Sequence, residues 1–507
     1  MSRIDDTLDI TVSPETLRIL RISANKFTSQ KHNMPKRTYS QSNKSNKSKK
    51  SNKSTTSSKS SQSKRKSIIN NYISKLINMY YNNDIVSNNY LQQAHTIQHI
   101  YPQQRRIIVI GDIHGDFEVA IKCLILAGCI ENIIPPTNKT VNAMDKFFNS
   151  LKWIGEDTYI VQLGDQIDRV RPQKWDTNNI SQDIPIEDEG STLEIFYLFY
   201  YLDQLARKHL GRVLCIIGNH EIMNIEGDFS YVSKKEFNCF NEHLQHIYHK
   251  QSKFPYHSRT LTQRRDTTHI HKSHNKSHNK SLTRVLPDGY RERLLAFAPT
   301  GLCANFIGSN YYTMLQIGNW LFCHGSPTLD IVNNYSIDMI NSIVSSYLLG
   351  IDTHNNHIVK HFTSITANNG ILWDRTFGED KLPENTLSHK LNNILNTYNT
   401  KQHNINTIQH KTNTHNNTTH IAIGHTPQYT QGINSICNQH VWRCDVAMSK
   451  AFQTTDNNNN SYNNTTNTHD TTHDTTHNTL NMPDTFKQGD IQVLEILNGV
   501  PKILSVL

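Results

Sequence analysis

The chain has 507 residues, of which 36% are hydrophobic, and it carries a formal net charge of +9. This hydrophobic share is low for a globular protein, which indicates that tracts rich in Asn, Thr, Ser, His and Lys lie outside any packed core. No run of about twenty apolar residues is present, so we expect no membrane-spanning helix and no membrane partner. The eight cysteines lack paired spacing, which excludes a disulfide framework and a zinc finger.

Residues 1–66 are predicted to form a disordered basic tail. The first twenty residues contain four acidic side chains and no apolar segment, so we expect no signal peptide and a cytoplasmic or nuclear compartment. Residues 31–66 hold twelve Lys or Arg and no acid. Such a tail could make weak contact with nucleic acid or act as a nuclear address at residues 64–66. We favour a solvated extension without a partner, because aromatic residues do not alternate with the charges.

Residues 67–100 are predicted to form a helical extension, because apolar residues recur at helical spacing from Ile68 to Tyr80. The rest of the chain, residues 101–507, is predicted to be one catalytic domain. Three tracts rich in Asn, Thr and His are interpreted as low-complexity surface insertions, although histidine-rich tracts can also bind metals. These insertions lie near residues 257–282, 392–419 and 454–486.

The strongest local signal is the run of four β-branched residues at 107–110, which predicts a buried strand. In extended backbone beyond this strand, Asp112 and His114 project to the same side. A carboxylate and an imidazole that converge at the end of a strand form half of a divalent metal site. The alternative is an ordinary strand and turn with a solvated Asp and a surface His. Residues 117–127 predict a helix that ends at Gly128.

The same pattern recurs along the chain, because four further apolar runs end in turns that carry Asp, Asn or His. These strands are predicted at residues 159–163, 213–217, 321–323 and 420–423, and their exit turns contain Asp165, Asn219, His324 and His425. In open α/β sheets, ligands bind beyond the carboxyl ends of the strands. We therefore expect these polar side chains to gather at one edge of the fold.

The remaining patterned segments predict an α/β fold with mixed strands. A capping box of Ser191 and Glu194 predicts the start of a deeply buried helix that runs to His209. Residues 311–315 and 320–323 are predicted to form a hairpin across a Gly318-Asn319 turn. Further helices are predicted at residues 144–151, 235–250 and 331–350, and further strands at 441–446, 491–497 and 502–506.

Five motifs in order resemble the calcineurin-like metallophosphoesterase superfamily: GDIHG, GDQIDR, GNHE, CHGS and GHTP. The Asp168-Arg169 pair is similar to the phosphoprotein phosphatase branch. The GHTP motif, LWDR at 372–375 and DVAMS at 445–449 look most like the bacterial-type (Shewanella-like) protein phosphatases. The chain departs from the family at Val170 and Ser326, where Gly is usual. The resemblance implies two β-sheets packed face to face and flanked by helices.

The resemblance also implies two divalent metal ions that share Asp165. One ion would be held by Asp112, His114 and Asp165, and the other by Asp165, Asn219, His324 and His425. A mixed set of imidazole and carboxylate ligands suits Mn, Fe or Zn better than Ca. The alternative for each residue taken alone is a polar turn residue that faces solvent.

Four further residues are predicted to act without binding metal. Arg169 is expected to grip the phosphate oxygens with its planar guanidinium, and Arg375 is a second candidate for this role or else part of a surface salt bridge. His220 is expected to protonate the departing oxygen, and Asp168 to orient His220.

These residues predict a phosphoesterase that hydrolyses phosphomonoesters by in-line attack of a metal-bridging hydroxide. A phosphorylated protein is the substrate that we expect. Hydrolysis of small phosphoesters or dinucleoside polyphosphates is the alternative, because the fold hosts several substrates. A catalytically silent module that binds phosphoprotein is disfavoured, because every expected ligand position is filled.

Overall fold

The fold is that of a computed structural model whose described residues belong to one unit, Ser63–Leu507. The described residues are 98–137, 139–172, 183, 185–241, 286–351, 359, 363, 370–408, 417–453, 487 and 489–506. Predictions for the basic tail, for nearly all of the helical extension and for the insertions at 257–282 and 454–486 therefore lie outside them. Among the described residues, no helix combines the length and apolar character needed to cross a membrane.

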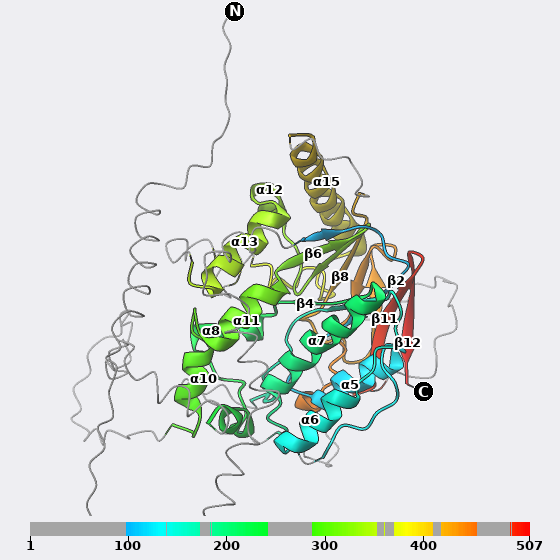
Figure 1. The fold of residues 1–507 in the computed structure, drawn as a ribbon. Coiled ribbons are helices and arrows are strands. Elements are labelled where there is room, and N and C mark those ends of the chain that lie inside the picture. The colour runs from blue at the N-terminus through cyan, green and yellow to red at the C-terminus, as the bar shows by residue number, and fades with distance from the viewer. Residues whose placement is uncertain are drawn as a thin grey trace, which may run out of the picture. The chain divides into compact units, whose positions relative to one another are not determined.

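Two six-stranded β-sheets lie at the centre of the described fold. Figure 1 shows their strands with helices around them. The first sheet has the order β12 (Val500–Ser505), β11 (Gln492–Leu497), β2 (Arg106–Ile110), β3 (Tyr159–Gln162), β4 (Arg212–Ile216) and β5 (Tyr311–Tyr312). The second has the order β1 (Ile100–Tyr101), β6 (Met314–Ile317), β7 (Trp320–Cys323), β8 (His420–Ile423), β10 (Val441–Arg443) and β9 (Asn434–Ile436). Side chains of both sheets enter one hydrophobic core.

The direction of the strands decides where their exit turns lie. In the first sheet β2, β3, β4 and β5 pair in parallel, and in the second β7, β8 and β10 pair in parallel. Parallel strands end at the same edge of a sheet, so their exit turns lie side by side. The residues of β2 from Ile107 to Ile110 are fully buried, as expected for a central parallel strand of β-branched residues.

Helices cover the sheets and connect the strands. In Figure 1, α5 and α7 lie along the first sheet, and contacts of α5 with β11 and of α7 with β4 support this placement. Helix α6 packs against these two helices through Phe147 and Phe148. The α-helices of the described chain are α5 (Phe117–Leu126), α6 (Val141–Ser150), α7 (Thr192–Ala206), α8 (Asn219–Glu226), α10 (Tyr290–Phe297), α11 (Leu302–Asn310), α12 (Leu329–Asn334), α13 (Ile337–Leu348) and α15 (Glu384–Ile408). Two 3-10 turns, Arg207–His209 and Lys450–Phe452, are also present. The described residues 234–241 are helical as well.

The interpretation of residues 392–419 as a low-complexity surface insertion is wrong over most of that range, because α15 continues to Ile408 and packs on the domain. The helix forms because buried side chains recur on one face despite the surrounding Asn and Thr residues. These side chains are Leu387, Leu391, Ile394, Leu395 and Tyr398. The hydroxyl of Tyr398 also donates to Gln316 Oε1 at 2.8 Å, which fixes the helix to β6.

Three local predictions need smaller corrections. Ser191 precedes α7 but makes no side-chain cap, and its hydroxyl donates to Glu189 Oε2 at 3.1 Å instead. The hairpin consists of β6 and β7, whereas residues 311–312 form β5 in the other sheet. The predicted helix at 331–350 is two helices, α12 and α13, separated where Ser336 caps the second by accepting from the Met339 amide.

Candidate active site

The five predicted strand exits meet at one site. Each residue predicted as a ligand is less than 5% exposed, and they are Asp112, His114, Asp165, Asn219, His324 and His425. A polar turn residue that faces solvent would be exposed, so the alternative interpretation of these positions is excluded. Burial of so many polar groups costs free energy unless they find partners or a cation.

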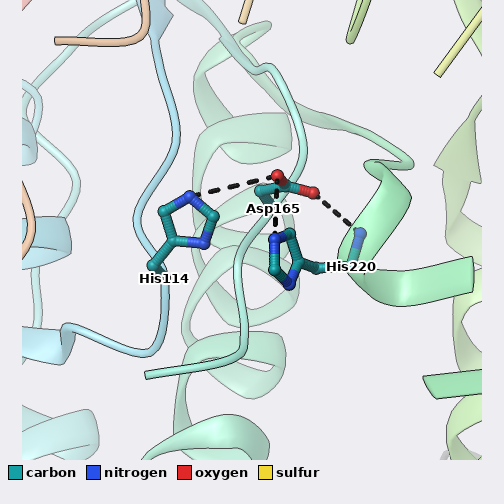
Figure 2. Close-up of side chains that lie close together, drawn as sticks. All are labelled: His114, Asp165 and His220. Carbon is teal, nitrogen blue, oxygen red and sulfur yellow. Dashed lines mark hydrogen bonds and ion pairs between the residues drawn. The ribbon is translucent and has the colours of Figure 1, made fainter. Parts of the chain in front are cut away.

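Asp165 lies at the centre of the site. Its Oδ2 atom is 3.3 Å from His324 Nε2, 3.8 Å from His220 Nε2 and 3.9 Å from His114 Nε2. Figure 2 shows the His114 and His220 rings both directed toward this carboxylate. The His220 amide also donates to Asp165 Oδ1 at 3.0 Å. One carboxylate therefore faces three imidazoles, which is the arrangement expected of a bridging ligand.

Two groups of side chains could each hold a metal ion among the described residues. One comprises His114, Asp165 and His220, and the other Asp165, His324 and His425. Asn219 belongs with the second group, because its Oδ1 lies 2.8 Å from His324 Nε2. Asp112 lies beside the first group, since its Oδ2 is 3.8 Å from His114 Nε2. The nitrogen and oxygen donors fit divalent transition metals.

Charge within the site also fits a cation. Burial is the largest cause that lowers the pKa of His114 and of His425, so both imidazoles are neutral and can donate a lone pair to a metal. Burial raises the pKa of Asp112 well above its usual value, and the nearby carboxylates of Asp445 and Asp165 raise it further. A bound cation would relieve this repulsion.

The site is built on strained backbone. His114, Asp165, Asp168 and His425 have φ between 48° and 74°, a region that residues other than glycine rarely adopt. Such conformations persist only where the surrounding structure enforces them. Here Glu221 contributes, because its carboxylate accepts the amides of Asp165 and Gly218 at 3.0 and 2.7 Å and so joins two exit turns.

The predicted pairing of His220 with Asp168 is present in the structure. His220 Nδ1 lies 2.8 Å from Asp168 Oδ2, which leaves Nε2 directed toward Asp165. Asp168 is fully buried, and its Oδ1 also accepts from Asn224 Nδ2 at 2.9 Å and from Arg293 Nη2 at 3.3 Å. The imidazole is thus fixed in orientation and tautomer by a carboxylate that is itself held in place.

Arg293 is a part of this arrangement that the sequence analysis missed. It is fully buried and lies within 6.0 Å of four phenylalanine rings, those of Phe229, Phe237, Phe240 and Phe297. A buried guanidinium of this kind needs an acid partner, and Asp168 supplies it. No motif marks Arg293, because it comes from α10, a helix far from the exit turns in sequence.

Asp445 was also missed as a site residue, although its motif was noted. It follows β10, which is parallel to β8, so it reaches the same edge as the other exit turns. Its side chain is buried, and Oδ2 lacks a hydrogen-bond partner among the described residues. Burial is the main reason that its pKa is raised to about 6. Counting β10 as a sixth strand exit would have identified it.

The two predicted phosphate clamps differ in position. Arg169 is fully buried, and its guanidinium donates to Asp116 Oδ2, Ser449 Oγ and the Ile186 carbonyl at 2.9–3.0 Å. Among the described residues its Nε has no partner, while Nη1 and Nη2 are both engaged by protein oxygens, so this geometry does not favour a bidentate grip on phosphate. Arg375 is half-buried and donates to the His425 carbonyl at 3.0 Å, which places its guanidinium beside one of the predicted ligands.

These features define the class of protein. The chain belongs to the calcineurin-like phosphoesterase family, whose model matches residues 105–448. It is 27% identical over 364 residues to Shewanella-like protein phosphatase 2 of Arabidopsis thaliana, covering 71% of this chain and 75% of that protein. It is 26% identical over 350 residues to Shewanella-like protein phosphatase 1 of Plasmodium berghei, covering 68% and 67%. The resemblance found in the motifs is confirmed, and the chain is a hydrolase of this family.

A solved structure has a similar outline. The cold-active protein-tyrosine phosphatase of a psychrophilic Shewanella species aligns with a TM-score of 0.43 and 17% identity, covering 80% of this chain and 82% of that one.

Proposed function

We propose that the chain is a phosphomonoesterase that uses two divalent metal ions and acts on phosphorylated protein. The observation that carries this proposal is the meeting of five strand exits at Asp165, with two groups of metal-binding side chains that share its carboxylate. Two bound ions would supply positive charge for the phosphoryl oxygens and an activated water for in-line attack. Mn, Fe or Zn fits the mixed set of nitrogen and oxygen donors.

The residues of the chain supply binding and proton transfer. Asp112, His114 and Asp165 are proposed to hold one ion, and Asp165, Asn219, His324 and His425 the other. His220 Nε2 is the proposed donor of a proton to the leaving oxygen, since Nδ1 is engaged by Asp168. The strained exit turns hold these groups in place before the substrate arrives, which reduces the cost of organising the site.

The relatives named as protein phosphatases favour phosphorylated protein over small phosphoesters as the substrate. Purified protein loaded with Mn should hydrolyse phosphopeptides with a kcat/KM at least about tenfold above that for dinucleoside polyphosphates, assayed in parallel. Faster hydrolysis of the dinucleotides would assign the chain to the alternative substrate class. Binding of phosphopeptide without turnover of either substrate would identify a silent binding module.

A further inference from the structure

Arg171, two residues after Arg169, contacts two aromatic rings that border the predicted metal site. Its guanidinium is stacked between two aromatic rings, 4.6 Å from the centroid of Phe452 and 5.4 Å from that of Tyr231. Each of these rings in turn contacts a site imidazole. The Phe452 centroid is 5.2 Å from that of His114, and the Tyr231 centroid is 4.7 Å from that of His220.

These contacts close into a ring of five side chains, because His114 and His220 also contact each other with centroids 4.9 Å apart. Both imidazoles face the Asp165 carboxylate, as Figure 2 shows. Arg171 is therefore separated from the central carboxylate of the site by one layer of side chains.

The backbone directs Arg171 to this position. Asp168 has φ of 74°, and the amides of Asp168 and Arg169 donate to Glu236 Oε1 and Oε2 at 3.2 and 3.1 Å. The amide of Val170 donates to the Tyr231 carbonyl at 2.9 Å, and its side chain is buried. The backbone hydrogen bond and the burial of the Val170 side chain, at a position where the family usually has Gly, anchor the turn that presents Arg171.

The donors of Arg171 are only partly used. Nη1 donates to the carbonyls of Asp168 and Val170 at 3.1 and 2.8 Å. Within the described part of the chain, its Nε and Nη2 donate to no protein acceptor, and the side chain is only half-buried. Arg169 differs in both respects, because it is fully buried and three of its contacts are to protein oxygens.

We propose that Arg171, stacked between Tyr231 and Phe452, is the arginine that binds the phosphoryl group of the substrate, with Arg169 serving as a structural ion pair. This assignment rests on the proposed phosphatase function and names a substrate-binding residue of that site. A guanidinium with two free N–H groups can bind two phosphoryl oxygens, and stacking on both faces fixes its plane at little entropic cost. Arg375, beside His425, is placed to contact the same group from the second metal-binding cluster.

The test compares Arg171→Met with wild-type protein, both loaded with Mn, and Arg105→Met is the matched control. Arg105 is exposed and pairs with Glu156 and Asp157 outside the site. Loss of the charge-assisted hydrogen bonds should weaken inhibition by inorganic phosphate and raise KM for a phosphopeptide by about 10- to 100-fold. Metal content and the melting temperature should stay at wild-type values, and Arg105→Met should change neither binding constant.

Two further variants separate binding from structure. Arg171→Lys should recover only part of the phosphate affinity, because an ammonium group cannot form the planar bidentate contact. Phe452→Leu keeps an apolar side chain but removes one stacking face, and it should weaken phosphate inhibition by about 2- to 5-fold, as expected for loss of a cation–π contact.

Unchanged phosphate inhibition and KM in Arg171→Met, with wild-type activity intact, would overturn the assignment. A second result would also overturn it. If Arg171→Met loses metal or melts at a much lower temperature, and Arg171→Lys restores both properties fully, then Arg171 is a structural residue. Failure of the proposed function is a different result, because the wild-type protein loaded with Mn would itself lack activity and phosphate binding.

Discussion

At the scale of single residues, the proposed function assigns metal binding and proton transfer to different side chains. Asn219 and His220 are neighbours in sequence, yet Asn219 Oδ1 faces His324 and the His220 ring faces Asp168 and Asp165. The first turn of α8 thus points two adjacent side chains toward different groups, which fits the different roles proposed for them. Substitution can tell these roles apart.

His220→Ala should keep both metal ions and lower kcat by about 10²–10⁴-fold, because it removes the proposed proton donor. The defect should be large for a phosphoserine peptide, whose alkoxide needs a proton, and smaller for p-nitrophenyl phosphate, whose leaving group does not. Asn219→Ala should instead lose metal and activity together. The test measures kcat and bound metal in the same preparations of both variants. If His220→Ala slows hydrolysis of both substrates equally, His220 is not the general acid.

Arg169 supports a second prediction at this scale, concerning stability. Its ion pair with Asp116 is fully buried, with 3.0 Å between Nη1 and Oδ2. Arg169→Met should lower the free energy of unfolding by about 3–5 kcal/mol, because it leaves Asp116 buried without its charge partner. Denaturant titration of the metal-free protein measures this. The double variant Arg169→Met/Asp116→Leu should lose less free energy of unfolding than the two single variants lose together. If the losses simply add, the two side chains are not coupled.

At the scale of elements, the strands were easier to predict from the sequence than the helices between them. Runs such as residues 107–110 are short, β-branched and fully buried, so period and composition agree. The helix in the tract at 392–419 was not predicted, because Asn, Thr and His dominate the composition of this tract. The apolar residues of α15 are few, although they all lie on one face. The amino-acid composition of a segment averages over all faces of a helix, whereas its packing on the domain depends only on the residues of one face.

The helical part of this tract is expected to contribute to stability. Ile394 is 5% exposed on the inner face of α15, whereas the neighbouring Asn392 is exposed. Ile394→Ala should cost about 2–4 kcal/mol through lost burial and a residual cavity. Asn392→Ala is the matched control and should be neutral or slightly stabilising, since Ala has the higher helix propensity. Equal, small effects on urea unfolding would mean that α15 does not pack on the domain.

At the scale of the whole molecule, motif order predicted the centre of the site, and the topology explains why. The exit turns belong to strands of two sheets whose parallel strands end at one edge, so residues from Asp112 to His425 converge. Arg293 and Arg171 could not be assigned in the same way. The first acts from a helix outside the motifs, and the second depends on aromatic neighbours, Tyr231 and Phe452, that are distant in sequence.

Residues 267–281, within the predicted insertion and outside the described part of the chain, should be dispensable. A polar surface loop contributes little to a core, and shortening it changes the loop-closure entropy only slightly. Deletion should leave the melting temperature within about 2–4 °C of wild type and the turnover within about twofold. A larger fall in either, or a loss of bound metal, would show that this tract supports the fold or the site.

The central claim is that activity needs two metal ions that share Asp165, and metal content measured alongside turnover tests it most directly. Protein stripped with a chelator should be inactive, and stepwise addition of Mn should restore phosphopeptide hydrolysis as occupancy approaches about two ions per chain. Asp165→Asn should bind fewer ions and stay inactive at the same Mn concentration. Full activity in wild-type protein with fewer than about one transition metal per chain would contradict the account.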